Sequence, residues 1–172
     1  MSIADSVSLR RAGPADAATL KPLIEGGYRG SSARRGWTHE ADIVEDERIG
    51  AGELAAMLAD PAIHFLIAEK DGQPVGCIAV TDKAEARAYF GLLCVDPPMQ
   101  SSGLGSRLIR EAEELARGLG ARIMEISVIE DREELIAMYQ RKDYRDTGRR
   151  DPFPAPQPRP LHFRLFEKRL HG

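Results

Sequence analysis

The sequence has 172 residues, of which 42% are hydrophobic and 30% are charged. This balance predicts a single folded domain over residues 1–172 and excludes an intrinsically disordered chain. The formal net charge of −3 gives no attraction to nucleic acid or to an anionic membrane surface, so we expect neither as a partner.

Targeting and metal-site patterns are missing from the sequence. No apolar run approaches the roughly 18 residues of a membrane helix, and residues 1–13 lack the apolar core of a secretory signal, so we expect a cytoplasmic protein. Cys77 and Cys94 lie in apolar stretches, which predicts buried thiols without a disulfide. The four histidines are scattered, so we expect no metal.

The N-terminal third predicts one strand and two helices. Residues 7–12 read as a strand, and Gly13-Pro14 ends it before a helical pattern that continues to Ile24. Residues 28–60 are mostly polar, with one helix expected over residues 52–58.

Three apolar runs follow and predict an antiparallel meander. Residues 65–69 and 75–80 are joined by a short connection through Asp71-Gly72, which is typical of a β-hairpin. A third run at residues 88–95 continues the pattern.

The C-terminal half predicts helix, strand, helix and a closing strand. Helical spacing covers residues 103–117 and 132–141, on either side of a strand at residues 123–129. Residues 149–160 contain five prolines, which predicts a loop, and alternation at residues 161–167 predicts the last strand.

The junction before the helix at residues 103–117 carries the chemical information. Gly103 and Gly105 allow a ligand to approach the backbone, and the free amides of a helix N-terminus favour a pyrophosphate. The alternative is that both glycines only form a tight turn. The segment has neither the Gly-Lys-Ser/Thr of a P-loop nor the third glycine of the dinucleotide fingerprint, whose place is taken by Leu108.

The segment Gln100-Ser101-Ser102-Gly103-Leu104-Gly105 resembles the acetyl-CoA-binding motif Gln/Arg-x-x-Gly-x-Gly/Ala of the GCN5-related N-acetyltransferase (GNAT) superfamily. The resemblance extends over about residues 65–144. It implies an α/β (α+β) fold whose mixed, mainly antiparallel central sheet is flanked by helices and splayed between strands 4 and 5. It also implies an N-acetyltransferase that moves acetyl from acetyl-CoA to an amine.

The resemblance further implies which residues hold acetyl-CoA. The main chain around Leu93 and Val95 would bind the pantetheine arm, residues 126–128 would form the opposite wall, and the amides after Gln100 would bind the pyrophosphate. The implied cofactor-binding residues are Leu93, Cys94, Val95, Gln100, Ser101, Ser102, Gly103, Leu104, Gly105 and Ser106.

Tyr139 occupies the position where this family commonly has a general acid, which would protonate the departing thiolate. The alternative is a core aromatic on an amphipathic helix. The chain departs from the family pattern at Arg132 and at Asp143. Arg132 is expected to be a solvated surface arginine, and the alternative is a contact to a coenzyme A phosphate. These departures leave open a non-catalytic acyl-CoA-sensing or protein-interaction domain of the same fold.

The acceptor would be an amine on a small molecule or a peptide. Tyr28 and Trp37 are aromatic residues in a polar segment, so they could line its pocket or anchor the loop. The general base is not identified, although Glu85 and Glu125 lie near the relevant strands. Glutamates and aspartates at positions 40, 42, 45 and 46 are further candidates, and the sequence leaves the oligomeric state open, a homodimer included.

Overall fold

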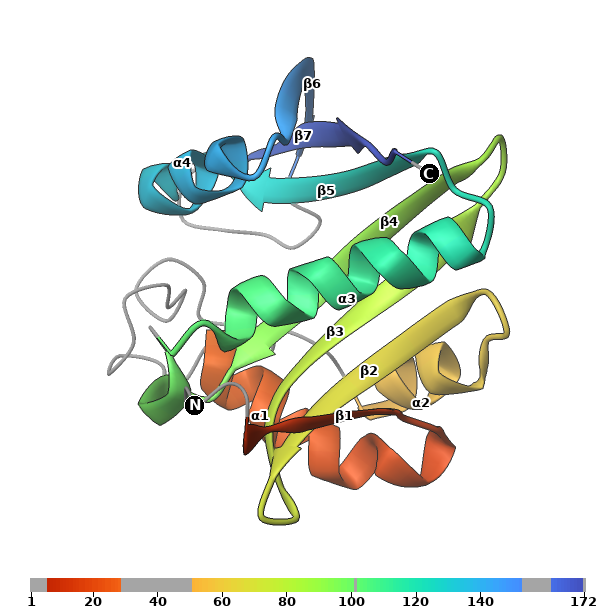
Figure 1. Ribbon diagram of the computed structural model, residues 1–172, viewed down its shortest axis with the longest axis vertical. Coiled ribbons are helices and arrows are strands. Elements are labelled where there is room, and N and C mark those ends of the chain that lie inside the picture. The colour runs from red at the N-terminus through yellow and green to blue at the C-terminus, as the bar shows by residue number, and fades with distance from the viewer. Residues whose placement is uncertain (1–5, 29–50, 101, 153–161, 172) are drawn as a thin grey trace.

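The computed structural model describes residues 6–28, 51–100, 102–152 and 162–171, which form one seven-stranded sheet in the order β1-β2-β3-β4-β5-β7-β6 (Figure 1). The strands are β1 (Ser8–Arg11), β2 (Ile63–Lys70), β3 (Gln73–Lys83), β4 (Arg87–Val95), β5 (Ile123–Ile129), β6 (Arg145–Pro152) and β7 (His162–Arg169). The helices are α1 (Ala17–Tyr28), α2 (Ala51–Ala59), α3 (Leu104–Gly118) and α4 (Glu133–Arg141), with short 3-10 turns at Pro14–Asp16 and Pro97–Met99.

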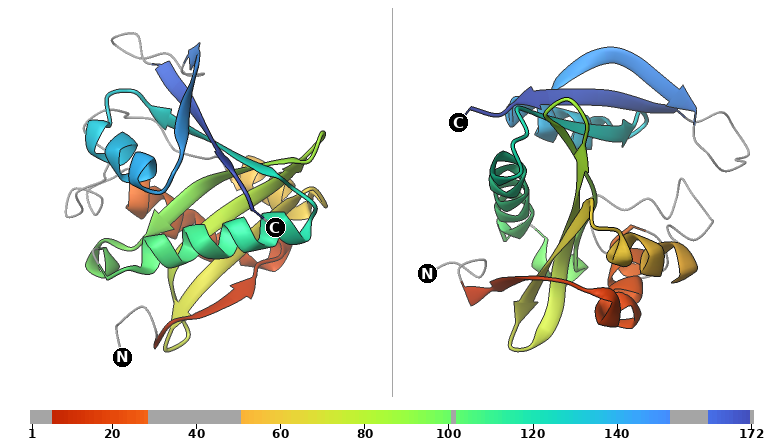
Figure 2. Two further views of the ribbon diagram at one scale, coloured as in Figure 1. Left: turned by 45° about the horizontal axis from the view of Figure 1, so that its top comes forward. Right: turned by 90° about the vertical axis from the view of Figure 1, so that its right-hand side faces the viewer.

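Helices cover both faces of the sheet (Figure 2). The larger core lies under α3 and α4, where Leu104 and Leu108 of α3 pack on Ile78 and Phe90 of the sheet. The smaller core lies on the other face under α1 and α2. All strand pairs are antiparallel except β4 with β5, which confirms the expected fold class.

The pairing between β4 and β5 is short. Residues 87–89 of β4 pair with residues 123–125 of β5, after which the two strands diverge (Figure 1). We call the region beyond Tyr89 and Glu125, where the strands no longer pair, the split. The expected splay between strands 4 and 5 is therefore confirmed.

A β-bulge in β4 lies at the split. Gly91 is opposite Ala79 and Cys94 is opposite Cys77, so two residues of β4 face one residue of β3, and Leu92 has a φ of 51°. The bulge shifts the alternation of side chains by one position. Phe90 therefore packs in the α3 core, whereas Leu92 and Cys94 pack in the α1 and α2 core.

The prediction of a loop at residues 149–160 is wrong for residues 149–152. Residues 149–152 belong to β6, which pairs with β7 at the edge of the sheet. Every residue of β6 is exposed, so no apolar alternation marks it. Pro152 is its last residue, a position where a strand tolerates the missing donor. Residues 153–160 lie outside the described part of the chain.

The cysteines and the helices each bear on an expectation from the sequence. Cys77 and Cys94 are both buried free thiols, as their apolar surroundings predicted. In the described part of the chain, no helix is both long and apolar enough to cross a membrane.

Candidate acyl-transfer site

The start of α3 has a backbone conformation that favours glycine. Gly103 precedes the helix with φ 93° and ψ −2°, a left-handed conformation that glycine adopts without strain. Its carbonyl accepts the amide of Arg107 (3.1 Å), and the amide of Leu104 donates to Ser102 Oγ (3.3 Å). The amides of Gly105 and Ser106 belong to the first turn, where a helix offers no internal acceptor, so they can receive an anion.

The residues around this turn hold its shape. Gln100 Nε2 donates to the carbonyl of Val95 (3.3 Å), which braces the connection from β4, and Met99 is buried beneath it. A Cβ atom built on Gly103 would have no heavy atom within 4 Å, so open space lies beside the backbone there. Ser101 lies outside the described residues.

Lys142, which no sequence motif marks, lies beside the first turn of α3. Lys142 Nζ donates to Ser106 Oγ (2.7 Å), although Lys142 follows α4 and is 36 residues away in sequence. Burial, reinforced by the nearby Arg110, lowers the pKa of Lys142. An ammonium in this position would be further stabilised by a phosphate at the helix N-terminus.

One wall of the split is the edge of β4. Beyond Tyr89 this edge has no pairing with β5, so main-chain groups between Phe90 and Val95 can bond an extended ligand, as an added strand would. Leu93 and Val95 are half-buried against the α3 core. Cys94 points the other way and its Sγ lies 3.9 Å from the carbonyl of Ile24, so only its main chain faces the split.

Tyr139 lies next to the split in an aromatic cluster. Its ring centroid is 6.0 Å from that of Phe90 on β4 and 5.8 Å from that of Tyr144, and Tyr139 is 6% exposed. The Tyr144 hydroxyl donates to the buried carboxylate of Glu113 (2.8 Å), which fixes one side of the cluster. The cluster is compatible with a packing role and with the expected chemical role of Tyr139.

The two departures from the family pattern are both at the ends of α4. Asp143 has a φ of 72°, so it adopts the left-handed conformation that glycine would otherwise supply after α4, and aspartate tolerates it. Arg132 was expected on the surface, but this is wrong. It is only 3% exposed at the start of α4, where its Nε donates to Glu134 (3.0 Å).

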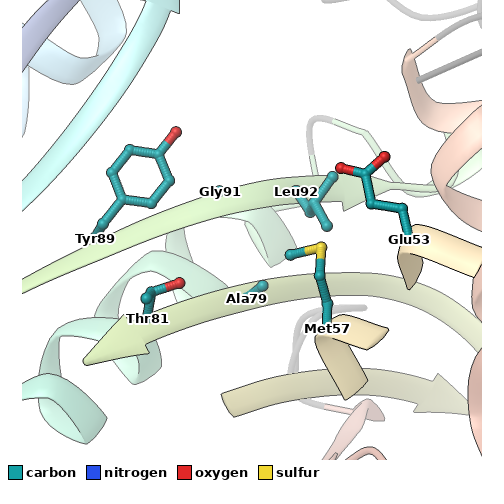
Figure 3. A pocket seen from close by; sticks show the side chains of 7 residues that line it. All are labelled: Glu53, Met57, Ala79, Thr81, Tyr89, Gly91 and Leu92. Atoms are coloured by element: carbon teal, nitrogen blue, oxygen red, sulfur yellow. The ribbon is translucent and has the colours of Figure 1, made fainter. Parts of the chain in front are cut away.

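A cavity of about 110 Å³ opens on the face of the sheet opposite α3 (Figure 3). We call it the α2 cavity. It is lined by Glu53, Met57, Ala79, Thr81, Tyr89, Gly91 and Leu92. The bulge of β4 therefore forms part of its wall, and the cavity reaches the same stretch of main chain that borders the split.

A hydrogen bond crosses the closed end of the split. The hydroxyl of Tyr89 lies 2.9 Å from Ser127 Oγ, which joins β4 to β5 where their main chains stop pairing. Tyr89 also lines the α2 cavity, so this hydrogen bond places the cavity beside the split.

Two of the acids considered as general bases, Glu125 and Glu85, lie in the described part of the chain. Glu125 accepts hydrogen bonds from Lys83 (2.5 Å) and Arg87 (2.7 Å) at the paired end of the strands. Burial raises the pKa of Glu125, but these two cations together lower it below its ordinary value, so this carboxylate is a weak base. Glu85 lies in the β3–β4 turn with a φ of 65°. The acids at positions 40, 42, 45 and 46 lie outside the described residues.

The aromatic pair predicted to line the acceptor pocket is Tyr28 and Trp37. Tyr28 is the last residue of α1, and Trp37 lies outside the described residues. Their role at the acceptor site stays a prediction.

Glu53, Tyr89 and Ser127 were not selected from the sequence, because neither spacing nor a motif marks them. Only the packing of α2 on the sheet and the divergence of β4 from β5 bring them near one another.

A mixed sheet that splits beside a glycine-capped helix places a helix N-terminus suited to an anion next to an unpaired strand edge. The chain belongs to the Acetyltransferase (GNAT) family, whose sequence model matches residues 30–144. The resemblance stated for residues 100–105 is therefore confirmed.

Two relatives have sequences similar to this chain. The aminoalkylphosphonate N-acetyltransferase of Salmonella typhimurium is 34% identical over 99 residues, which cover 55% of this chain and 64% of the relative. The IAA acetyltransferase of Azospirillum brasilense is 34% identical over 116 residues, which cover 66% of this chain and 72% of the relative. The chain thus spans slightly less than two thirds of the Salmonella relative.

Solved structures share the fold at low sequence identity. The PaiA N-acetyltransferase of Thermoplasma acidophilum, in complex with coenzyme A, has a TM-score of 0.74 at 19% identity, over 95% of this chain and 99% of that one. An N-acetyltransferase of Staphylococcus aureus has a TM-score of 0.73 at 13% identity, over 96% and 99% of the two chains.

Proposed function

We propose that this chain transfers the acetyl group of acetyl-CoA to a primary amine by direct attack within a ternary complex. The observation that supports this most strongly is the juxtaposition of a glycine-capped helix N-terminus with an unpaired β4 edge. The first is suited to a diphosphate and the second to the amide-containing arm that follows it.

The residues present fit acetyl-CoA. The amides of Gly103, Gly105 and Ser106 would hold the pyrophosphate, with open space beside Gly103 and the ammonium of Lys142 near Ser106. The β4 edge around Leu93 and Val95 would hold the pantetheine arm. Bound acetyl-CoA would supply the chemistry: the amine nitrogen bonds the carbonyl carbon, the C–S bond breaks, and sulfur takes the electron pair.

Tyr139 would donate its hydroxyl proton to the departing sulfur. The phenol is buried beside Phe90 at the split, where little water competes for the proton. The amine would lose its own proton to solvent through the α2 cavity. An aligned phenol of this kind contributes on the order of 10²-fold to the rate.

Direct attack is favoured over a covalent acetyl-enzyme. Cys94 lies on β4, the strand that would hold the pantetheine arm, but its thiol is buried in the α1 and α2 core. It faces the carbonyl of Ile24. Buried structural cysteines of this kind are inert as nucleophiles.

The test combines calorimetry with acetyl-CoA and a thiol-release assay over a panel of amines. An aminoalkylphosphonate belongs in the panel because of the activity named for the Salmonella relative. We expect binding and turnover on at least one amine, and we expect Tyr139→Phe to lower kcat at least 10-fold while leaving acetyl-CoA affinity nearly unchanged.

Tyr144→Phe is the matched control. Tyr144 belongs to the same aromatic cluster, but its hydroxyl is committed to Glu113. It should lose stability and keep its turnover in the folded fraction. Binding without turnover across the panel would favour the sensing domain instead, and equal losses in both variants would remove the acid role from Tyr139.

A further inference from the structure

The α2 cavity connects the split to α2. At one end Tyr89 lines the cavity and contacts Ser127 across the split (2.9 Å). At the other end Glu53 and Met57, one helical turn apart on α2, close over Leu92 (Figure 3). If the proposed acetyl transfer is correct, an amine that reaches the thioester from this face extends toward Glu53.

The described cavity lining has one acidic side chain and no basic one. Among the described residues that line the cavity, Glu53 is the one carboxylate, and none is a lysine, an arginine or a histidine. The nearest cations on β3 and β4 are Lys83 and Arg87, which are held by Glu125 at the paired end of the strands. A negative charge therefore faces the cavity with no cation of the lining to neutralise it.

The remaining lining suits a short apolar spacer. Met57, Ala79 and Leu92 provide apolar surface between the two polar ends, while Thr81 and Tyr89 offer hydroxyl groups near the split. A cavity of about 110 Å³ has room for several water-sized groups, which is enough for a short alkyl chain.

We infer that Glu53 is a specificity-determining residue, which selects acceptors with a second positive charge at a short distance from the reacting amine. This inference rests on the proposed function and adds the acceptor class, a short aliphatic diamine. The reacting nitrogen lies at the Tyr89 end and the distal ammonium pairs with Glu53. An acceptor whose distal group is a phosphonate meets the same carboxylate as a like charge and is disfavoured.

Three acceptors that differ only in the distal group test this inference: 1,3-diaminopropane, 3-amino-1-propanol and 3-aminopropylphosphonate. In wild type we expect kcat/KM to decrease in that order. Glu53→Gln should lower kcat/KM for the diamine by about 5-fold at low ionic strength, leave the amino alcohol unchanged and raise the phosphonate. Intrinsic amine reactivity cancels when one acceptor is compared between two proteins.

Glu111→Gln is the control, because Glu111 is an exposed carboxylate on α3, on the opposite face of the sheet. It should change none of the three values. An equal loss for all three acceptors in Glu53→Gln, or no change for the diamine, would overturn the inference.

Calorimetry separates this inference from the proposed function. Diaminopropane titrated into the protein loaded with coenzyme A should bind more weakly to Glu53→Gln than to wild type. If wild type acetylates none of the acceptors but shows this difference, the proposed function fails and the charge selection stands. If it acetylates amines without a charge preference, the reverse holds.

Discussion

Replacing Gly103 with alanine should weaken the fold although nothing obstructs the added methyl group. Gly103 has a φ of 93°, and a Cβ atom there would have no heavy atom within 4 Å. The left-handed conformation costs an L-residue about 1–2 kcal/mol, while alanine restricts the unfolded chain and returns about 0.4–1 kcal/mol. The expected net loss is about 1 kcal/mol in the free energy of unfolding.

Urea denaturation measures this loss against Gly105→Ala. With a slope of about 2 kcal/mol/M for a small protein, the midpoint of Gly103→Ala should fall by about 0.5 M. Gly105 has no positive φ, and its Cβ would lie 3.8 Å from Val95 Cγ2, an ordinary contact. Alanine also favours the helix there, so this midpoint should stay or rise. Equal midpoints for the two variants would refute the left-handed cap.

The remaining predictions concern the sheet on either side of the split. In Gly76→Ala the new Cβ would lie 3.0 Å from the carbonyl oxygen of Cys94 and 3.1 Å from Leu108 Cδ1, so β3 and α3 must separate. We expect a loss of about 1–3 kcal/mol by urea denaturation, and an unchanged midpoint would contradict this packing. Because the fold lowers the pKa of Glu125, its ion pairs stabilise the protein above the unfolded pKa, near 4, and this stability is lost as pH falls through the lowered value. Glu125→Gln should therefore be less stable than wild type at pH 7, and the gap should narrow as pH falls below the unfolded pKa. A gap that does not change with pH would argue against the ion pairs as its source.

Local sequence patterns predicted most of the fold. The hairpin at Asp71-Gly72, where both residues have positive φ, follows from turn chemistry that few other residue pairs satisfy. The amphipathic spacing of residues 103–117 located α3 within one residue at each end. The exposed strand β6 was missed because its register depends on pairing with β7 rather than on its own side chains.

The candidate site divides in the same way. The proposed anion-binding turn is contiguous in sequence, so its glycines could be recognised before the fold was known. The proposed acceptor face is built from side chains on α2, β4 and β5, and the bulge at Leu92 decides which side chains of β4 beyond it share a face. A bulge shifts alternation without a distinctive residue. Glu53, Tyr89 and Ser127 could not be found from spacing, because the packing of α2 on the sheet and the divergence of β4 from β5 bring them near one another.

A crystal structure of the chain with acetyl-CoA tests the central claim most directly. The claim is that the first-turn amides of α3 bind the diphosphate and so direct the thioester between β4 and β5. The predicted result is a pyrophosphate within hydrogen-bond distance of the amides of Gly103, Gly105 and Ser106, with the acetyl carbon at the split. A diphosphate bound elsewhere, or an acetyl group outside the split, would contradict it.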